Sequence, residues 1–410
     1  MAEQATKIVV LGGGYAGVMA AVRLAGKTKR LRTAVTLVSG LERFVERPRL
    51  HEQAAGRELN GHALAEMVAG TKARFVQGWV RAIRADDRTV VVETTRGAET
   101  LSYDFLLVAL GSHVERATVP GVREHAYALD AYGEMATADL RQRLRGLGKS
   151  VFHLIVAGGG ATGIEAAAQF KAAHPQARVT LVTRGEVGAF KGARIQRHVR
   201  AALAAQGIAL VERQPVTAVT AGGVMTAIGA LPADVVVWAG GFAASPLAKD
   251  AGICVNARNQ IVADPFLRSV TQPEIFSAGD MAAPLEEPGA PMRMSLFTAL
   301  VSGAQTADNI VAAIKGKEPQ PFSFAWYGQA IALGPNDAAG FATYPADTPV
   351  GPVYRGRTAV ALRRFFVWYL KAALELERRF PGFFFWNGRG RYARQQNRRR
   401  SEAACQARRP

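Results

Sequence analysis

Cysteine is nearly absent from this chain. Its 410 residues include only Cys254 and Cys405, which are far apart and form no CxxC pair. A disulfide framework, a thiol redox relay and a cysteine zinc site are therefore excluded. We expect Cys254, which lies in an apolar segment, to be a small buried side chain. The seven histidines show no metal-ligand spacing, so no metal site is predicted.

Long apolar runs are also lacking. No run approaches the roughly 20 residues that a transmembrane helix needs, and no basic region followed by an apolar stretch opens the chain. Together with the scarcity of cysteine, this predicts a cytoplasmic protein. Acidic residues are outnumbered, 33 against 51 Lys and Arg, and the formal net charge of +18 favours anionic partners. A hydrophobic content of 49% predicts a folded protein of two or three domains.

Two segments of the chain resemble each other, about 146 residues apart. Residues 7–21 and 153–167 each begin with a short β-branched run, continue through GxGxxG and end in an Ala-rich stretch with helical spacing. A second strand follows each copy, at 34–38 and at 178–182. The β-turn-α-β pattern thus occurs twice, which favours two dinucleotide-binding units over a glycine-rich turn in an unrelated sheet.

The three glycines of each motif have separate physical roles. The first allows a tight turn after the strand, the second lets the backbone approach a pyrophosphate, and the third lets the helix pack on the strand. The helix N-terminus then presents free N–H groups to the phosphates. The glycines concerned are Gly12, Gly14 and Gly17 in the first copy and Gly158, Gly160 and Gly163 in the second.

Three further apolar segments end in glycine: 101–112, 233–241 and 275–280. We expect each to be a buried strand, with its ligand-facing end at the glycine. In their order along the chain, all these motifs resemble those of the two-dinucleotide-binding-domain flavoproteins, the pyridine nucleotide–disulfide oxidoreductase superfamily. Within it, the chain looks most like the type II NADH dehydrogenase-like branch without redox cysteines. The resemblance covers about residues 7–315.

The resemblance implies an α/β fold with an FAD domain, an inserted nicotinamide domain and an α-rich C-terminal cap. The expected boundaries are 1–115 and 256–318 for the two parts of the FAD domain, 116–255 for the nicotinamide domain, 319–386 for the cap and 387–410 for a disordered basic tail.

Site residues are also implied. Glu165 would lie near the nicotinamide and flavin rings, where it positions the carboxamide or relays a proton. A helix starting near Ser295 would point its N-terminus at the flavin. Asp280 would bond the ribityl or pyrophosphate group. The remaining residues expected at FAD are Gly12, Gly14, Tyr15, Ala16, Gly17, Ser39, Arg47, Gly111 and Gly279, and those expected at the nicotinamide dinucleotide are Gly158, Gly160, Ala161, Thr162, Gly163, Arg184 and Gly241. His51 is a weaker acid/base candidate.

Departures from the family pattern bear on the donor and the acceptor. Ser39 stands where an acidic residue would grip the FAD ribose, and Thr183-Arg184 stands at the same place in the second motif. An arginine there accommodates a 2′-phosphate, so the sequence leans towards NADPH, unless Arg184 is an ordinary solvated arginine. The glutamine motif typical of quinone-reducing relatives is missing near 295, with no glutamine until Gln305.

The C-terminal region has its own pattern. From Ala359 to Phe380, apolar residues recur every three or four positions, which predicts an amphipathic helix. Three interpretations stay open: packing on the flavin domain or on a second subunit, contact with an acidic membrane surface, and, least favoured, nucleic-acid binding through the arginine-rich tail.

Taken together, the sequence predicts an NAD(P)H-oxidising FAD enzyme, cytoplasmic or peripheral on the inner face of the membrane. Its small-molecule acceptor is a quinone in the leading interpretation. A soluble aromatic compound in a biosynthetic pathway is the alternative, and a redox sensor that binds nucleic acid is the third reading.

Overall fold

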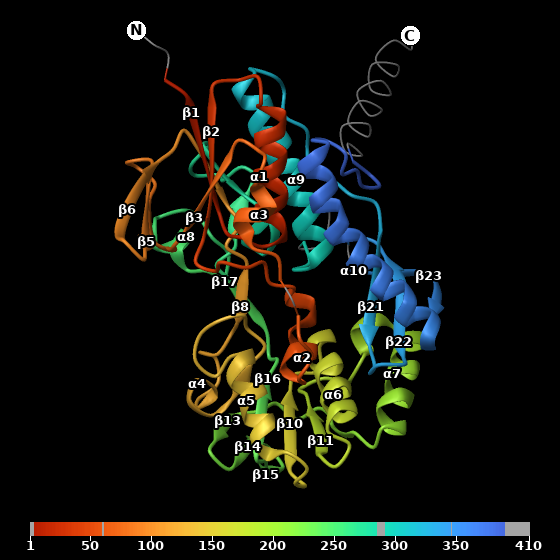
Figure 1. The fold of residues 1–410 in the computed structure, drawn as a ribbon. Coiled ribbons are helices and arrows are strands. Elements are labelled where there is room, and N and C mark those ends of the chain that lie inside the picture. The colour runs from red at the N-terminus through yellow and green to blue at the C-terminus, as the bar shows by residue number, and fades with distance from the viewer. Residues whose placement is uncertain (1–3, 60, 285–291, 346, 390–410) are drawn as a thin grey trace, which may run out of the picture.

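Two five-stranded parallel sheets form the framework of the computed structural model, which describes residues 4–59, 61–284, 292–345 and 347–389. Figure 1 shows one sheet in the upper part of the molecule and the other in the lower part. In sheet order, the first has β19 (Ile275–Ser277), β7 (Phe105–Val108), β1 (Thr6–Leu11), β2 (Thr33–Ser39) and β3 (Ala73–Gln77). The second has β12 (Ala209–Val211), β11 (Arg178–Val182), β10 (His153–Ala157), β16 (Val235–Trp238) and β9 (Tyr127–Ala128).

The order of these strands along the chain shows that the second unit is inserted in the first. Strand β19 follows the whole lower sheet in sequence, yet it pairs with β7 in the upper sheet. The chain crosses between the units through β8 (Ser112–Val114) and β17 (Phe242–Ala244), which pair antiparallel. The expected α/β fold, with one dinucleotide-binding unit inside another, is therefore confirmed.

The longer helices cover one face of each sheet, and much of the opposite face packs on smaller antiparallel sheets. In chain order the helices are α1 (Tyr15–Lys27), α2 (Leu50–Ala54), α3 (Leu64–Val68), α4 (Val122–His125), α5 (Thr137–Leu147), α6 (Ala161–Ala173), α7 (Ala193–Ala205), α8 (Leu247–Asp250), α9 (Leu296–Ile314) and α10 (Gly356–Arg379), with 3₁₀ turns at Arg47–Arg49, Ala189–Lys191 and Gly279–Met281. Among the residues that the structure describes, none of these helices is long and apolar enough to cross a membrane.

Smaller antiparallel sheets complete the fold. One contains β4 (Trp79–Arg84), β5 (Thr89–Thr94) and β6 (Gly97–Ser102), a second contains β13 (Ala218–Thr220), β14 (Gly223–Thr226) and β15 (Gly229–Pro232), and a third contains β21 (Tyr327–Ala332), β22 (Ala338–Thr343) and β23 (Pro349–Tyr354). Strands β18 (Ile261–Ala263) and β20 (Ala282–Pro284) form a parallel pair. The β21–β23 sheet packs against α10, so the C-terminal region contains a sheet that the sequence pattern did not predict.

The segment 101–112 is not the single strand that its apolar character predicted. It contains the end of β6, a turn, β7 and the start of β8. The turn is fixed because the Asp104 carboxylate accepts a hydrogen bond from the backbone N–H of Lys7 at 2.6 Å. A polar side chain that bonds to a neighbouring strand thus ends one strand and sets the register of the next.

Helix α9 begins where the sequence predicted. Ser295 is its N-cap, and its hydroxyl accepts a hydrogen bond from the backbone N–H of Thr298 at 3.2 Å. The helix packs closely on α1, because a Cβ on Gly303 would lie 2.4 Å from the carbonyl oxygen of Ala16. This tight contact fixes the N-terminus of α9 relative to the first glycine-rich turn.

Helix α10 confirms the amphipathic helix but not its predicted packing face. Its buried residues are Ala359, Leu370, Ala373, Leu374 and Glu377. The recurring pattern put Phe366, Tyr369 and Phe380 on the packed side, but all three are exposed, because α10 lies on α1 through Leu370, Ala373 and Leu374 instead. Phe365 and Trp368 are exposed as well, and we call Phe365, Phe366, Trp368 and Tyr369 the aromatic face of α10. The predicted tail lies almost wholly outside the described residues, from 390 onward.

Candidate functional site

The two glycine-rich turns have the same steric design. A Cβ on Gly12 would lie 2.2 Å from the carbonyl oxygen of Ala109, and one on Gly17 would lie 1.8 Å from that of Gly12. In the second turn, the matching distances are 2.3 Å for Gly158 and 1.8 Å for Gly163. The first and third glycines therefore leave no room for any side chain.

The middle glycines differ from their neighbours. A Cβ on Gly14 or Gly160 would meet no atom within 4 Å, so the backbone there borders open space. Both residues are the N-caps of their helices, and neither helix has a side-chain cap bond. The first N–H groups of α1 and α6 are thus available to an anion. This arrangement fits the pyrophosphate groups that the sequence implies at both turns.

A cavity of about 210 Å³ adjoins the first turn and reaches the start of α6. It brings together residues from both glycine-rich units, which lie far apart in sequence. The predicted site residues that line it are Gly14, Tyr15, Ala16, Arg47, Gly111, Thr162, Glu165, Gly279, Asp280 and Ser295, joined by Val45, Pro48, Leu50, His51 and Phe242 among others. Residues expected at the flavin therefore meet Thr162 and Glu165, which are expected at the nicotinamide dinucleotide, in one cavity.

Asp280 is fixed at one side of this cavity. The Ser112 hydroxyl donates a hydrogen bond of 2.6 Å to its carboxylate. Burial raises the pKa of Asp280, while the bond from Ser112 and the charge of Arg47 oppose that rise. The hydroxyl of Tyr15, another residue of the cavity, is also buried and has no hydrogen-bond partner among the described residues. An unpaired phenol beside an open glycine turn fits a site built for a polar ligand.

Glu165 lies at the opposite side, on α6, and it is held by two groups from the C-terminal region. Its carboxylate accepts a hydrogen bond of 3.0 Å from the backbone N–H of Ala332 on β21. The guanidinium of Arg363 on α10 lies 3.8 Å away and also donates a 3.0 Å bond to Glu52. The candidate catalytic carboxylate is therefore positioned by residues that sequence reasoning did not single out.

A second α10 contact lies nearby. Lys371 donates a 2.8 Å hydrogen bond to Glu46, which also pairs with Arg49. Although burial opposes it, these bonds hold the pKa of Glu46 below its usual value. Charge pairs thus connect the segment 46–52 to the C-terminal helix α10. No pattern in the sequence distinguishes Arg363 and Lys371 from the other charged residues of 359–380.

Several predicted residues lie outside the residues that line this cavity, namely Gly12, Gly17, Ser39, Gly158, Gly160, Ala161, Gly163, Arg184 and Gly241. Ser39 and Thr183 occupy equivalent places after β2 and β11, and each hydroxyl accepts a bond from its own loop, from Leu41 and Gly185 respectively. Arg184 is exposed, and its side chain has no hydrogen bond or ion pair within the part of the chain that the structure describes.

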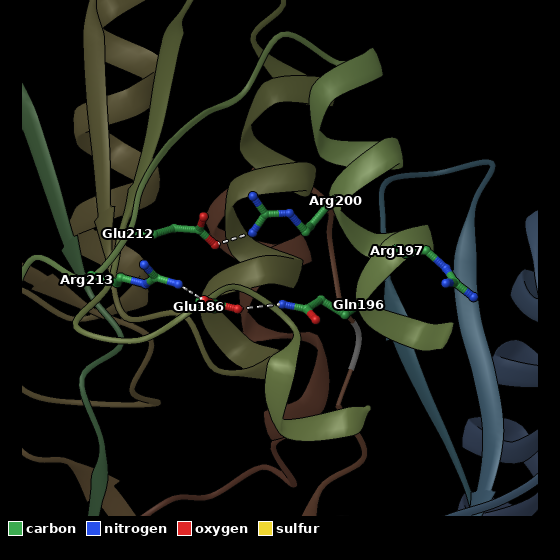
Figure 2. Close-up of a pocket in the computed structure, with 6 residues that line it drawn as sticks. All are labelled: Glu186, Gln196, Arg197, Arg200, Glu212 and Arg213. Carbon is green, nitrogen blue, oxygen red and sulfur yellow. Dashed lines mark hydrogen bonds and ion pairs between the residues drawn. The ribbon is translucent and has the colours of Figure 1, made fainter. Parts of the chain in front are cut away.

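Another opening lies beside the loop after β11. Figure 2 shows its lining residues: the Arg213 and Gln196 side chains both point to Glu186, the Arg200 side chain points to Glu212, and Arg197 points away. The two glutamates are therefore engaged by Arg213 and Arg200. A free guanidinium at Arg184 and a paired carboxylate at Glu186 are the charged groups closest in sequence to the end of β11.

Two expectations about single residues are corrected or limited. Cys254 is exposed rather than buried, because the apolar residues beside it, such as Ile253, take the inward positions. Gln305 is buried within α9, where its amide donates to Asn309 and to the carbonyl of Gln320. That glutamine therefore supports the helix and does not face the cavity.

Comparison with known proteins gives a consistent result. The family model described as pyridine nucleotide-disulphide oxidoreductase matches residues 6–310. A demethylphylloquinone reductase (NdbB) of Synechocystis is 27% identical over 358 residues, which cover 82% of this chain and 87% of that protein. A type II NADH:quinone oxidoreductase of Haemophilus influenzae is 26% identical, with the same two coverages.

Solved structures show a similar fold. The NDH2 of Plasmodium falciparum in complex with NADH superposes with a TM-score of 0.75 at 15% identity, covering 92% of this chain and 99% of that one. The sulfide:quinone oxidoreductase of Aquifex aeolicus has a TM-score of 0.73 at 20% identity, with coverages of 92% and 96%.

Proposed function

This chain belongs to the pyridine nucleotide-disulphide oxidoreductase family, and on that basis we propose that it is an FAD enzyme that oxidises NAD(P)H and reduces a quinone. The observation that carries the proposal is the single cavity in which Gly14, Asp280 and Ser295 of the outer unit meet Thr162 and Glu165 of the inserted unit. A ligand at each glycine-rich turn would bring its ring end into this shared space.

The flavin, when bound, supplies the hydride acceptor and the route for electrons to a second substrate. The chain's own residues bind and orient. The uncapped N-termini of α1 and α6 each hold a pyrophosphate. The N-terminus of α9 directs its partial positive charge at the flavin edge. Glu165 receives the nicotinamide carboxamide, since its carboxylate is already oriented by Ala332 and Arg363.

The quinone acceptor rests on similar proteins whose names specify quinones, in Synechocystis and in Haemophilus influenzae. A soluble aromatic acceptor would replace the quinone if only such compounds reoxidise the reduced protein.

For the donor, we propose NADPH on the strength of Arg184. Its side chain is exposed after β11, where a guanidinium reaches a 2′-phosphate, and Glu186 in the same loop is paired with Arg213. The name of the similar protein of Haemophilus influenzae specifies NADH instead. Measuring NADH and NADPH with the same protein decides which of the two observations, the exposed Arg184 or the name of the similar protein, indicates the donor.

The proposal also places the enzyme at the cytoplasmic face of a membrane. The aromatic face of α10 is exposed, with Phe365 and Tyr369 stacked and with Arg357 and Arg364 exposed on the same helix. Aromatic groups at headgroup depth with neighbouring arginines suit an acidic lipid surface. A second subunit is the competing occupant of this face.

Anaerobic stopped-flow mixing of the FAD-loaded protein with NADH and with NADPH tests the central claim. Either donor should bleach the flavin absorbance, and a quinone should restore it. If neither donor bleaches the flavin, the proposed function is wrong. If NADH alone is fast, the interpretation of Arg184 is wrong.

A further inference from the structure

His51 places an unsatisfied polar atom at the shared cavity. The residue lies on α2 and is 3% exposed, and its Nε2 has no hydrogen-bond partner among the described residues. It lines the cavity together with Leu50, Thr162 and Glu165. Buried polar atoms are almost always hydrogen-bonded, so a buried nitrogen left without a partner, in a residue of the cavity wall, points to a ligand that completes the bond.

The position of α2 explains how His51 reaches this place. The helix belongs to the outer unit in sequence, yet it packs on α5 and α6 of the inserted unit. Figure 1 shows α2 at the junction of the upper and lower parts, beside α6. Leu50 and Ala54 join the hydrophobic core of the lower unit and orient the helix. The imidazole is thereby held where the ends of two ligands would meet.

The charges around His51 are balanced in a way that leaves the ring neutral. Burial lowers its pKa, and Arg363 and Arg49 act in the same direction, while Glu165 and Glu52 oppose them. These carboxylates are themselves engaged by the arginines. A neutral imidazole offers one N–H donor and one acceptor nitrogen, which suits an amide group rather than a charged phosphate.

We propose that Nε2 of His51 hydrogen-bonds an amide group of the bound ring pair. The amide is the carboxamide of the nicotinamide or the imide edge of the flavin, and both present a carbonyl and an N–H. His51 is then a positioning residue that fixes one ring relative to the other. The inference rests on the proposed function, because it assumes that both rings enter this cavity.

The test uses the full chain loaded with FAD, as wild type, His51→Leu and His51→Gln. Leucine fills the buried volume without a polar atom, whereas the glutamine amide can reach about the position of Nε2. Three quantities are measured: the dissociation constant of NAD⁺ followed by the flavin spectrum, the midpoint potential of the flavin, and the thermal midpoint without dinucleotide. None of these depends on turnover.

If the partner is the nicotinamide, His51→Leu weakens NAD⁺ binding about tenfold, the value of one lost hydrogen bond to a buried group. If the partner is the flavin, the midpoint potential shifts and the affinity for NAD⁺ stays the same. In both cases His51→Gln should keep the measured property, the affinity for NAD⁺ or the midpoint potential, close to its wild-type value. The thermal midpoint of His51→Leu should not fall, because the variant removes an unsatisfied buried nitrogen.

Two results overturn the inference. One is that neither binding nor potential changes in His51→Leu. The other is that His51→Leu and His51→Gln lose thermal stability alike, which marks a structural histidine. If His51→Leu does not fold, His51→Asn replaces it: the shorter amide stays polar but falls short of the Nε2 position, so it should show the same losses. If NAD(P)H cannot bleach the flavin of the wild type, the proposed function is refuted. The midpoint potential of the flavin can still be compared between wild type and His51→Leu.

Discussion

The Arg363 guanidinium on α10 lies 3.8 Å from the Glu165 carboxylate on α6, and one of its other nitrogens donates to Glu52 at 3.0 Å. Arg363 belongs to the C-terminal region, beyond the residues 6–310 that match the family model. The helix with the exposed aromatic face therefore also positions the carboxylate expected at the nicotinamide. The C-terminal region and the carboxylate expected at the nicotinamide are therefore in direct contact.

We expect Arg363→Met to slow flavin reduction by NAD(P)H about 10- to 100-fold. The change removes a charge-assisted hydrogen bond from Glu52 and the ion pair at 3.8 Å from Glu165, and a hydrogen bond to a charged group contributes roughly 1.5–3 kcal/mol. Stopped-flow reduction at saturating and limiting donor separates binding from rate. Arg364→Met is the matched control, since Arg364 is the next residue and is exposed. Equal rates in both variants would show that Glu165 needs no support from α10.

Arg184 gives a prediction about donor choice. Arg184→Glu should lower the preference for NADPH over NADH at least about tenfold, because a carboxylate repels a 2′-phosphate and can bond a ribose 2′-hydroxyl. The ratio of kcat/KM for the two donors measures this preference. Arg96→Glu makes the same charge change at an exposed turn between β5 and β6 and should leave the ratio unaltered. An unchanged ratio in Arg184→Glu would mean that Arg184 is an ordinary solvated arginine.

Local rules carried the sequence analysis a long way. Glycine turns and β-branched runs depend on residues close in sequence, and these predicted the two glycine-rich units with their central strands. The helix start near Ser295 followed from the family resemblance. The failures involve contacts between distant segments. The turn at Asp104 depends on a bond to Lys7, and the packed face of α10 depends on the shape of α1. Neither partner is visible from the local pattern.

The residues of the candidate site also fall into two groups, those that sequence motifs predict and those that depend on contacts between distant segments. Gly14, Asp280 and Glu165 follow from motifs, and the structure brings them to one cavity. Nothing in the sequence singles out Arg363 and Lys371, because their partners Glu165 and Glu46 lie more than a hundred residues away. Charge pairs between distant elements leave no periodic signal in a single sequence.

A buried charge cluster gives a prediction about stability. Arg23 on α1 and Glu377 on α10 are both fully buried, and their side chains are joined by a 2.9 Å bond. The Glu377 carboxylate also accepts bonds from the backbone N–H groups of Gly382 and Phe384. Glu377→Gln should destabilise the protein by about 1.5–3 kcal/mol, because it removes one charged partner from the buried Arg23, which keeps its bonds to Asp308.

Thermal and denaturant midpoints measure that loss. Glu375→Gln is the control: this carboxylate pairs with Arg378 and Arg379 at the surface, and its loss should cost about 0.5 kcal/mol. If the two variants unfold at the same midpoint, Arg23 and Glu377 do not anchor α10.

Lys191 gives a pH-dependent prediction. Its side chain is fully buried 2.6 Å from Asp347, and burial, reinforced by Arg293, lowers its pKa from 10.5 to about 8. Below pH 8 both the folded and the unfolded protein hold the proton. Between about 8 and 10.5 only the unfolded chain holds it, so the folded state gains stability as the pH rises.

The stability of wild type relative to Lys191→Met should therefore increase across this window, by up to roughly 3 kcal/mol. Unfolding midpoints of both proteins at pH 7, 9 and 10.5 provide the measurement, and the comparison cancels the titration of other groups. A constant difference would show that Lys191 keeps an ordinary pKa.

The last prediction concerns what contacts the aromatic face of α10, a lipid surface or a second copy of the chain. Phe365 and Trp368 are both more than half exposed, with ring centroids 5.9 Å apart. Burying an aromatic side chain contributes roughly 1.5–3 kcal/mol, so the double change to serine should weaken vesicle binding about 100-fold or more. Binding of wild type should also require acidic lipid and fall with added salt, because Arg357 and Arg364 contribute through charge.

Cosedimentation with acidic and with neutral vesicles measures this binding. The matched control changes Val151 and Ile228 to serine, two exposed apolar residues of the inserted unit, and should bind vesicles like wild type. Light scattering on the same proteins distinguishes the second occupant. If the Phe365 and Trp368 variant still binds vesicles while a dimer separates into monomers, the face is an interface between two copies of the chain. The membrane part of the proposal then fails, although the electron-transfer part does not depend on it.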